Sequence, residues 1–212
     1  MRLDVMRLYD SAYSGNCLKV RLLLGLLGRP CERVPIDIFA GDNLTDAYAR
    51  INPAREVPAL ELDDGTVLVQ SNAILWYLAE GTPLLPSTAL GRAQTAQWLA
   101  FEQEWIMRGI AGARFRLLTG RPGGRERVAL ARQALDLLAA HVDGRAWVVG
   151  DAPSIADLSI YAYAHRAHEA EVQPPGPVTA WLERVEALPG LANDLEPYPD
   201  HARPGAGRSI YD

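Results

Sequence analysis

The stretch Ile51–Leu75, INPAREVPALELDDGTVLVQSNAIL, decides the fold. It predicts a strand that begins at Val57-Pro58, where proline is unusual because it donates no ladder hydrogen bond. At the first residue of a strand, and as a cis peptide, proline holds the N–H and C=O of the preceding residue outward and unpaired. An extended peptide can pair with such a residue as an added strand. The stretch therefore predicts a peptide-binding edge at Val57.

The residues that follow predict a hairpin and then a helix. Asp64-Gly65 is a turn signal, and the second strand runs from Thr66 to Val69. A helix is expected over 72–80, with Ser71 at its N-cap. Because the start of a helix attracts anions, the pattern sets an anion-friendly site beside the open backbone. This outlines a site for a peptide carboxylate.

The chain before this stretch predicts alternating strands and helices. Apolar residues recur at three- and four-residue steps from Cys17 to Leu27, which indicates a helix that stops at Gly28. The other expected elements are a strand at 6–9 with residues 1–5 as its extension, a strand at 32–36 and a short helix at 42–50. The order βαβ-α-ββα predicts a mixed sheet with helices on its faces.

From Ala89 onward the pattern is helical throughout. Helices are expected at 91–118, 125–141, 154–169 and 178–188, followed by an irregular tail. Ser154-Ile155-Ala156-Asp157 is a capping box at one of these helix starts, and we expect its role to be structural. The expected division is an α/β domain at 1–82, a linker at 83–88, an all-helical domain at 89–196 and a tail at 197–212.

Composition narrows the classes of function. Of 212 residues, 49% are hydrophobic and 22% are charged, as in a globular protein. The net charge of −5 argues against a nucleic-acid partner. No apolar run reaches the roughly 20 residues of a membrane span, and the start does not resemble a signal peptide. The two cysteines, Cys17 and Cys31, lack metal-ligand spacing. A cytoplasmic protein without a bound metal is expected.

Three motifs together give a family resemblance. QSNAILWYLA follows the Val57-Pro58 strand, YSGNCLKVRLLLGLLG precedes it, and SIADLSIY lies downstream. The chain resembles the cytosolic glutathione transferases over nearly its whole length, in particular bacterial, serine-type, theta-like members. The resemblance implies a thioredoxin-like N-terminal domain, an all-α C-terminal domain and a homodimer.

The resemblance implies a catalytic role for Ser14. Aligned by the first strand and by Val20, Ser14 falls where serine-type members keep the serine that donates a hydrogen bond to the glutathione thiolate. The alternative is that Ser14 only caps the helix. Ser11, Tyr13 and Asn16 are its rivals. With Ser14 in place of a first cysteine, a Cys-x-x-Cys disulfide cycle is impossible, and Cys17 is expected to be a core thiol.

The resemblance also implies three glutathione-binding residues. The Val57 main chain would pair with the cysteinyl residue, Ser71 would bind the α-carboxylate of the γ-glutamyl end, and Gln70 would bind its ammonium. Members often have Glu or Asp in place of Gln70. Arg55-Glu56 is a further departure, because Glu56 would lie near the carboxylates of glutathione unless it points away or Arg55 compensates it.

The expected function is conjugation of the glutathione thiolate to an apolar electrophile, in detoxification, with glutathione as co-substrate. The alternatives are glutathione-dependent reduction of a peroxide or disulfide, and a non-catalytic binding module of the same fold. Trp105, Arg108, Tyr161 and His165 are candidates for the electrophile pocket, whereas Trp98 and Phe101 are expected in the core. The identity of the electrophile does not follow from the sequence.

Overall fold

A computed structural model describes residues 6–203. The predicted extension at 1–5 and the end of the predicted tail, 204–212, lie outside the described residues. The chain divides into two compact units, Met1–Leu78 with Ala192–Asp212, and Ala79–Leu191. The C-terminal stretch thus belongs with the first unit, whereas the sequence placed residues 192–196 with the helical domain. The domain limits drawn from the sequence stay a prediction.

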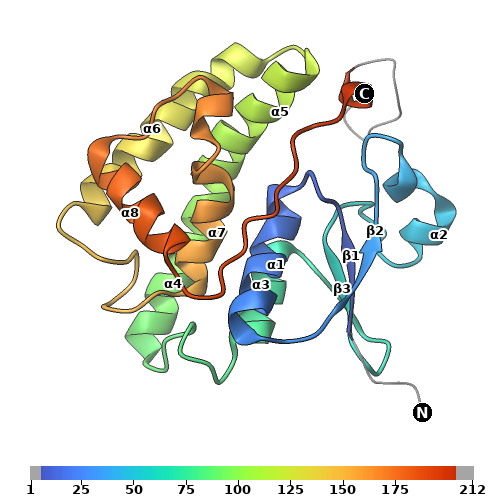
Figure 1. Cartoon of the computed structure of the whole chain (residues 1–212), viewed down its shortest axis with the longest axis horizontal. Helices are drawn as coiled ribbons and strands as arrows, with labels where there is room; N and C mark the ends of the chain where they lie inside the picture. The colour runs from blue at the N-terminus through green and yellow to red at the C-terminus, as the bar shows by residue number, and fades with distance from the viewer. Residues whose placement is uncertain (1–5, 204–212) are drawn as a thin grey trace. The chain divides into compact units, whose positions relative to one another are not determined.

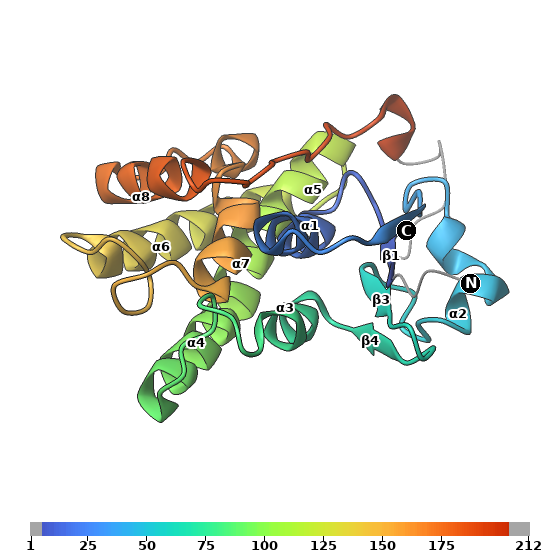
Figure 2. The same ribbon diagram turned by 60° about the horizontal axis from the view of Figure 1, so that its bottom comes forward.

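The first unit has the predicted βαβ-α-ββα order. Its elements are β1 (Arg7–Asp10), α1 (Gly15–Leu27), β2 (Glu32–Pro35), a 3₁₀ turn (Asp42–Leu44), α2 (Asp46–Ala49), β3 (Ala59–Glu61), β4 (Val67–Val69) and α3 (Ser71–Ala79). Within the described residues the sheet has the order β2-β1-β3-β4. β1 and β2 are parallel, whereas β3 is antiparallel to both β1 and β4. In both ribbon views α1 and α3 lie on one face of the sheet and α2 on the other (Figures 1 and 2).

Local signals explain where α1 begins and ends. Ser14 is its N-cap and accepts a hydrogen bond from Cys17 N–H, and Gly28 ends it in the left-handed conformation, at φ 59°. Between them the helix buries the side chains of Leu18, Leu22 and other residues completely. Burial of each leucine stabilises the fold by about 1.5–3 kcal/mol.

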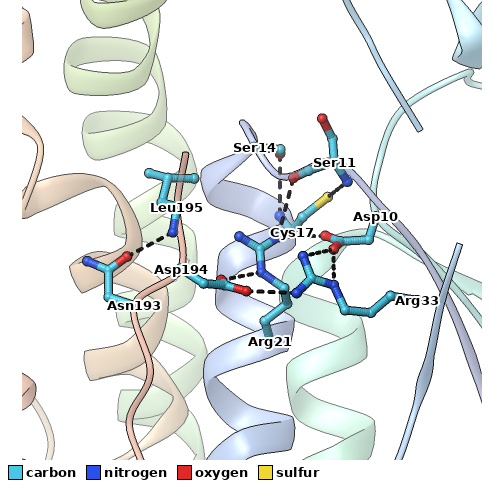
Figure 3. Close-up of polar contacts among 9 residues, drawn as sticks. All are labelled: Asp10, Ser11, Ser14, Cys17, Arg21, Arg33, Asn193, Asp194 and Leu195. Atoms are coloured by element: carbon cyan, nitrogen blue, oxygen red, sulfur yellow. Dashed lines mark hydrogen bonds and ion pairs between the residues drawn. The ribbon is translucent and has the colours of Figure 1, made fainter. Parts of the chain in front are cut away.

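The C-terminal stretch Ala192–Arg203, called the strap below, is tied to the first unit by charges. Asp194 accepts from Arg21 Nε at 2.6 Å and from Arg33 Nη1 at 2.8 Å. Both arginines also bind Asp10, which is 3% exposed at the end of β1. Figure 3 shows this network joining β1, α1, β2 and the strap. The sequence did not reveal it, because its members are far apart along the chain.

The strap also reaches the loop between β1 and α1. Glu196 N–H donates to the Ala12 carbonyl at 3.0 Å. Farther along, Tyr198 packs its ring on Phe39 with 5.0 Å between centroids, and His201 Nε2 lies 2.8 Å from Asp37 Oδ2. As predicted, the segment from 197 to 203 is irregular apart from a 3₁₀ turn at Asp200–Ala202, and these contacts tie it to the first unit.

The second unit is helical, as predicted. Its elements are α4 (Ala89–Phe101), a π-helical stretch (Glu102–Ala111), α5 (Gly112–Thr119), α6 (Gly124–Val142), α7 (Ile155–Ala164), a 3₁₀ turn (Ala167–Ala170) and α8 (Gly176–Glu186). The single helix predicted at 91–118 is therefore one helical run whose middle is wound more widely. A periodicity near 3.6 does not distinguish this winding over ten residues.

The predicted capping box is present at the start of α7. Asp157 Oδ2 accepts from the Ser154 N–H at 2.9 Å, and its Oδ1 accepts from Val148 N–H and from Trp181 Nε1. Asp157 is fully buried, and this burial raises its pKa. The box therefore joins α7 to α8 and to the preceding loop, in addition to starting a helix.

Candidate functional site

Ser14 lies at the N-terminus of α1 with an extended backbone, at φ −93° and ψ 121°. Its Oγ accepts from the Cys17 N–H at 3.3 Å, a contact drawn in Figure 3. A hydroxyl that accepts one hydrogen bond still has its own proton to donate. No acceptor for that proton is found among residues 6–203, and the side chain is partly exposed. The cap and an available donor thus coexist in one residue.

Ser11 and Asn16 are less available to a ligand than Ser14. Ser11 is 1% exposed, and its Oγ is buried without a hydrogen-bond partner in the described part of the chain. Asn16 Oδ1 accepts from the Ser71 hydroxyl at 3.2 Å. Ser11 is therefore enclosed in the protein, and Asn16 serves the neighbouring helix start.

Tyr13 is partly exposed and packs against Phe39, with 5.7 Å between ring centroids. Burial of the phenol is the main cause that raises its pKa, and the nearby carboxylates of Asp37 and Glu196 add to it. The phenol therefore stays protonated at neutral pH and is a weaker acid than free tyrosine.

Cys17 is a core thiol, as predicted. It is completely buried, its Sγ accepts from the Ser11 N–H at 3.3 Å, and burial raises its pKa to about 12. A thiol in this state is inert at neutral pH.

Val57 lies two residues before the first residue of β3, and the Val57–Pro58 peptide is cis, as predicted. The strand itself begins at Ala59, two residues later than the sequence suggested. Within the described chain, no backbone hydrogen bond involves the N–H or C=O of Val57. Its side chain packs against a buried cluster of Tyr9, Tyr48 and Ala59. The side chain is thus anchored while the main chain stays open.

Two buried donors hold the residue before Val57. Tyr48 Oη and Asn52 Nδ2 each donate to the Glu56 carbonyl at 2.7 Å. Both donors are about 3% exposed, so they fix the loop rigidly from inside. The orientation of the Val57 main chain therefore depends on two side chains that the sequence did not single out.

Ser71 is the first residue of α3, and Gln70 occupies the cap position, since the Gln70 carbonyl accepts from Ile74 N–H at 3.0 Å. The expectation that Ser71 is the N-cap is therefore wrong by one residue. The Ser71 hydroxyl accepts from Lys19 Nζ at 3.4 Å and donates to Asn16. Lys19 is 0% exposed, so its Nζ lies inside the protein behind the helix start.

Gln70 adopts a left-handed backbone, at φ 71°. This conformation is uncommon for a residue with a side chain, and such residues concentrate at functional sites. Its exposed side chain donates from Nε2 to Glu56 Oε2 at 3.2 Å. The loop before Val57 and the start of α3 are thereby joined.

Arg55 does not compensate Glu56, contrary to one expectation from the sequence. Its guanidinium contacts the Leu44 carbonyl and lies 3.3 Å from the carboxylate of Asp46. Its backbone is left-handed, at φ 57°, and Asn43 Nδ2 donates to its carbonyl at 2.7 Å. The side chain is therefore engaged on the other side of the loop.

These contacts connect the segments that carry the four predicted site residues. Hydrogen bonds link Ser71 to Asn16 in the first turn of α1, and Gln70 to Glu56 beside Val57. Ser14 begins the same turn as Asn16. Sequence reasoning missed Lys19, whose signal was a charged residue inside a largely apolar helical run.

Some of the residues expected to line an electrophile pocket in the second unit are packing residues. Tyr161 is 0% exposed, stacks on His165 with 4.8 Å between centroids and donates to Glu186. His165 Nδ1 lies 2.8 Å from the Tyr161 carbonyl, and burial lowers its pKa to about 4. Trp105 is partly exposed and Arg108 exposed. Trp98 is buried as predicted, and Phe101 partly so.

Residues 6–203 contain neither a metal-ligand cluster nor a membrane-spanning helix. No cluster of three or more His, Cys, Asp or Glu side chains is arranged to hold a metal ion there. No helix in this range is long and apolar enough to cross a bilayer.

Comparison with known proteins assigns both units. Residues 13–80 match the model of the glutathione S-transferase N-terminal domain, and residues 111–199 match that of the C-terminal domain. A solved glutathione S-transferase from Pseudomonas fluorescens is 38% identical, covers 91% of this chain and all of its own, and gives a TM-score of 0.86. One from Xanthobacter autotrophicus is 39% identical, covers 88% of this chain and 95% of its own, and gives a TM-score of 0.83. A maleylacetoacetate isomerase from Rhizobium meliloti is 28% identical over 92% of this chain and 93% of its own.

Proposed function

The chain belongs to the glutathione S-transferase family, and we propose that it conjugates the glutathione thiolate to an apolar electrophile. The observation that carries this proposal is the open main chain of Val57, joined through the Gln70–Glu56 contact to the helix start at Ser71, behind which Lys19 lies. An extended tripeptide with carboxylates at both ends suits such a combination. Glutathione is the co-substrate, and no metal or organic prosthetic group takes part.

The Val57 main chain is proposed to pair with the cysteinyl residue of glutathione. One N–H and one C=O on the same residue match the C=O and N–H of an extended peptide. Since Tyr48 and Asn52 hold the loop from inside, this pairing needs little reorganisation. The cysteinyl thiol is then directed to one place.

The start of α3 is proposed to bind the α-carboxylate of the γ-glutamyl residue. The first N–H groups of a helix lack intrahelical partners, and the helix dipole favours an anion there. Lys19 Nζ lies behind the Ser71 hydroxyl, and in this proposal Lys19 is protonated and adds a positive charge there. Lys19 is therefore a positioning residue in this proposal, acting through Ser71.

Ser14 is proposed to activate the thiol by donating its hydroxyl proton to the thiolate. A thiol of pKa about 8.5 is only a few per cent ionised at pH 7, and a lower pKa by two units requires about 2.7 kcal/mol. One hydrogen bond to a charged group contributes about 1.5–3 kcal/mol, and a helix N-terminus adds about 0.3–1. The hydroxyl and α1 together are sufficient without a histidine base.

In the reaction, the glutathione thiol releases its proton to solvent and the thiolate attacks an electrophilic carbon. A carbon–sulfur bond forms, and the leaving group departs with its electron pair or the electrons move into the acceptor. The binding site contributes by holding and ionising the nucleophile. Detoxification, a cytoplasmic location and a homodimer remain parts of the proposal.

Activity with a chlorodinitrobenzene-type haloarene tests the proposal. Conjugation with glutathione, together with retention on immobilised glutathione, would support it. Turnover of a hydroperoxide or of a maleyl substrate in place of the haloarene would assign the same bound thiolate to reduction or isomerisation. Retention without any turnover would indicate a binding module, and absence of retention would refute the glutathione site.

A further inference from the structure

Glu56 presents a negative charge at the proposed glutathione site. Its side chain is exposed, and its Oε2 accepts from Gln70 Nε2 at 3.2 Å. In the part of the chain that the structure describes, Glu56 has no ion pair with a basic side chain. The charge is therefore not neutralised where a ligand would meet it.

The position of Glu56 is set by its backbone. Tyr48 and Asn52 donate to its carbonyl, and the guanidinium of Arg55 is engaged at Leu44 and Asp46. Because its backbone is fixed beside Val57, the Glu56 carboxylate can reach only nearby positions. The contact with Gln70 shows that it reaches toward α3.

The carboxylate also sets the orientation of the Gln70 amide. A carboxylate only accepts hydrogen bonds, so it selects the NH₂ end of the amide and leaves the amide oxygen for a donor. Within the described residues, Gln70 Oε1 has no hydrogen-bond donor. The Glu56 carboxylate and the Gln70 amide oxygen are two acceptors on side chains that contact each other, and such acceptors suit an alkylammonium group.

The next residue prefers the opposite charge. Ser71 follows Gln70 directly and has the Lys19 ammonium behind its hydroxyl. An α-amino acid carries its ammonium and carboxylate on one carbon. A site for a cation at Gln70 next to a site for an anion at Ser71 therefore matches it. The γ-glutamyl end of glutathione is such a group.

We propose that Glu56 binds the α-ammonium of the γ-glutamyl residue and makes the site selective for thiols that keep this ammonium. The inference rests on the proposed glutathione site and deepens it. The neutral Gln70 then needs no charge of its own, because the carboxylate comes from the loop before Val57.

The alternative position for the Glu56 side chain predicts a change in glutathione affinity of the opposite sign. If Glu56 lay near the carboxylates of glutathione, it would repel the ligand, and its neutralisation would tighten binding. The effect of Glu56→Gln on affinity therefore separates the two by direction as well as by size.

The test compares glutathione with its deamino analogue, glutaryl-cysteinyl-glycine, by titration calorimetry. Glu56→Gln should weaken glutathione binding about fivefold, the upper range for a solvent-exposed ion pair, and less at high salt. It should leave the deamino analogue unaffected or bound more tightly. Asp63→Asn, which removes an exposed carboxylate from the β3–β4 turn, should change neither affinity.

A second variant keeps the charge and moves it. Adding Gln70→Glu to Glu56→Gln should restore the preference for glutathione over the deamino analogue. If wild type binds glutathione and Glu56→Gln binds it equally or more tightly, the role of Glu56 is overturned while the proposed function stands. If wild type binds neither peptide, the proposed function fails, and the role of Glu56 fails with it.

Discussion

Single residues at this site make structural contacts and, as proposed, also contact glutathione. The Ser14 hydroxyl caps α1 by accepting from Cys17 N–H, and its proton is available to a sulfur. Ser71 begins α3 and connects Lys19 to Asn16. Because structural and binding contacts share these atoms, a variant at either position must be measured for stability as well as for affinity.

Ser71→Ala is predicted to weaken glutathione binding about tenfold or more while the protein stays folded. The variant removes a hydroxyl that lies next to the Lys19 ammonium, and a hydrogen bond to a charged group contributes about 1.5–3 kcal/mol. Calorimetric titration measures the affinity, and circular dichroism the fold.

Thr88→Ala is the matched control, since Thr88 caps α4 through its hydroxyl. It should lower stability by about 1 kcal/mol without changing glutathione affinity. Equal affinities of wild type and Ser71→Ala would restrict Ser71 to a structural role.

At the scale of elements, buried charges fix α1 and the strap. Asp10 holds Arg21 and Arg33, and Asp194 holds the same two side chains from the strap. Arg21 is 8% exposed, so its charge needs these partners. The network therefore ties α1, which Ser14 caps, to β1, β2 and the strap.

Asp10→Ala is predicted to lower the free energy of unfolding by about 3–5 kcal/mol, because it leaves the Arg21 charge buried beside one carboxylate. Denaturant titration measures this loss. Asp64→Ala, at an exposed turn of the same unit, should lower it by far less. Similar losses of unfolding free energy in both variants would contradict the stabilising role given to the network.

His165 is predicted to make the second unit sensitive to acid. Its Nδ1 faces the Tyr161 carbonyl and its Nε2 accepts from Arg166 Nε at 3.1 Å, which fits a neutral ring. Burial lowers its pKa from 6.5 to about 4. Between these values the unfolded chain binds the extra proton, so stability falls as pH drops from about 6.5 to 4.

The expected loss is about 3 kcal/mol over this interval. His165→Asn keeps a donor for the Tyr161 carbonyl but does not titrate, so its unfolding free energy should depend less on pH. His168→Asn, at an exposed position, should behave as wild type. If the unfolding free energy depends on pH equally in wild type and in His165→Asn, other groups cause the acid sensitivity.

At the scale of the whole molecule, the first unit is assembled from two distant stretches of chain. The sequence predicted the order of its strands and helices, because alternation, turn residues and caps are local signals. The strap, whose partners are some 160 to 170 positions away, has no such signal. Its ordered contacts with Arg21 and Phe39 therefore emerge only in three dimensions.

The residues of the candidate site, too, could be predicted only where their signal is local in the sequence. Val57 and Ser71 were predicted because Val-Pro and a serine before a helix are short patterns, and the structure places them as open backbone and helix start. Lys19 and Glu56 contact their partners across gaps of 52 and 14 positions. In the sequence, Lys19 is one residue of a largely apolar helix, and Glu56 is a negative charge expected near the carboxylates of glutathione.

Titration of the bound glutathione thiol tests the central claim, that the Ser14 hydroxyl activates it. Thiolate absorbance against pH should show a pKa in wild type well below that of free glutathione, and Ser14→Ala should raise it by about 1–2 units. Ser14→Thr, which keeps a hydroxyl and a helix cap, should stay close to wild type. If wild type and Ser14→Ala titrate alike, the activating group is elsewhere and the account of Ser14 is contradicted.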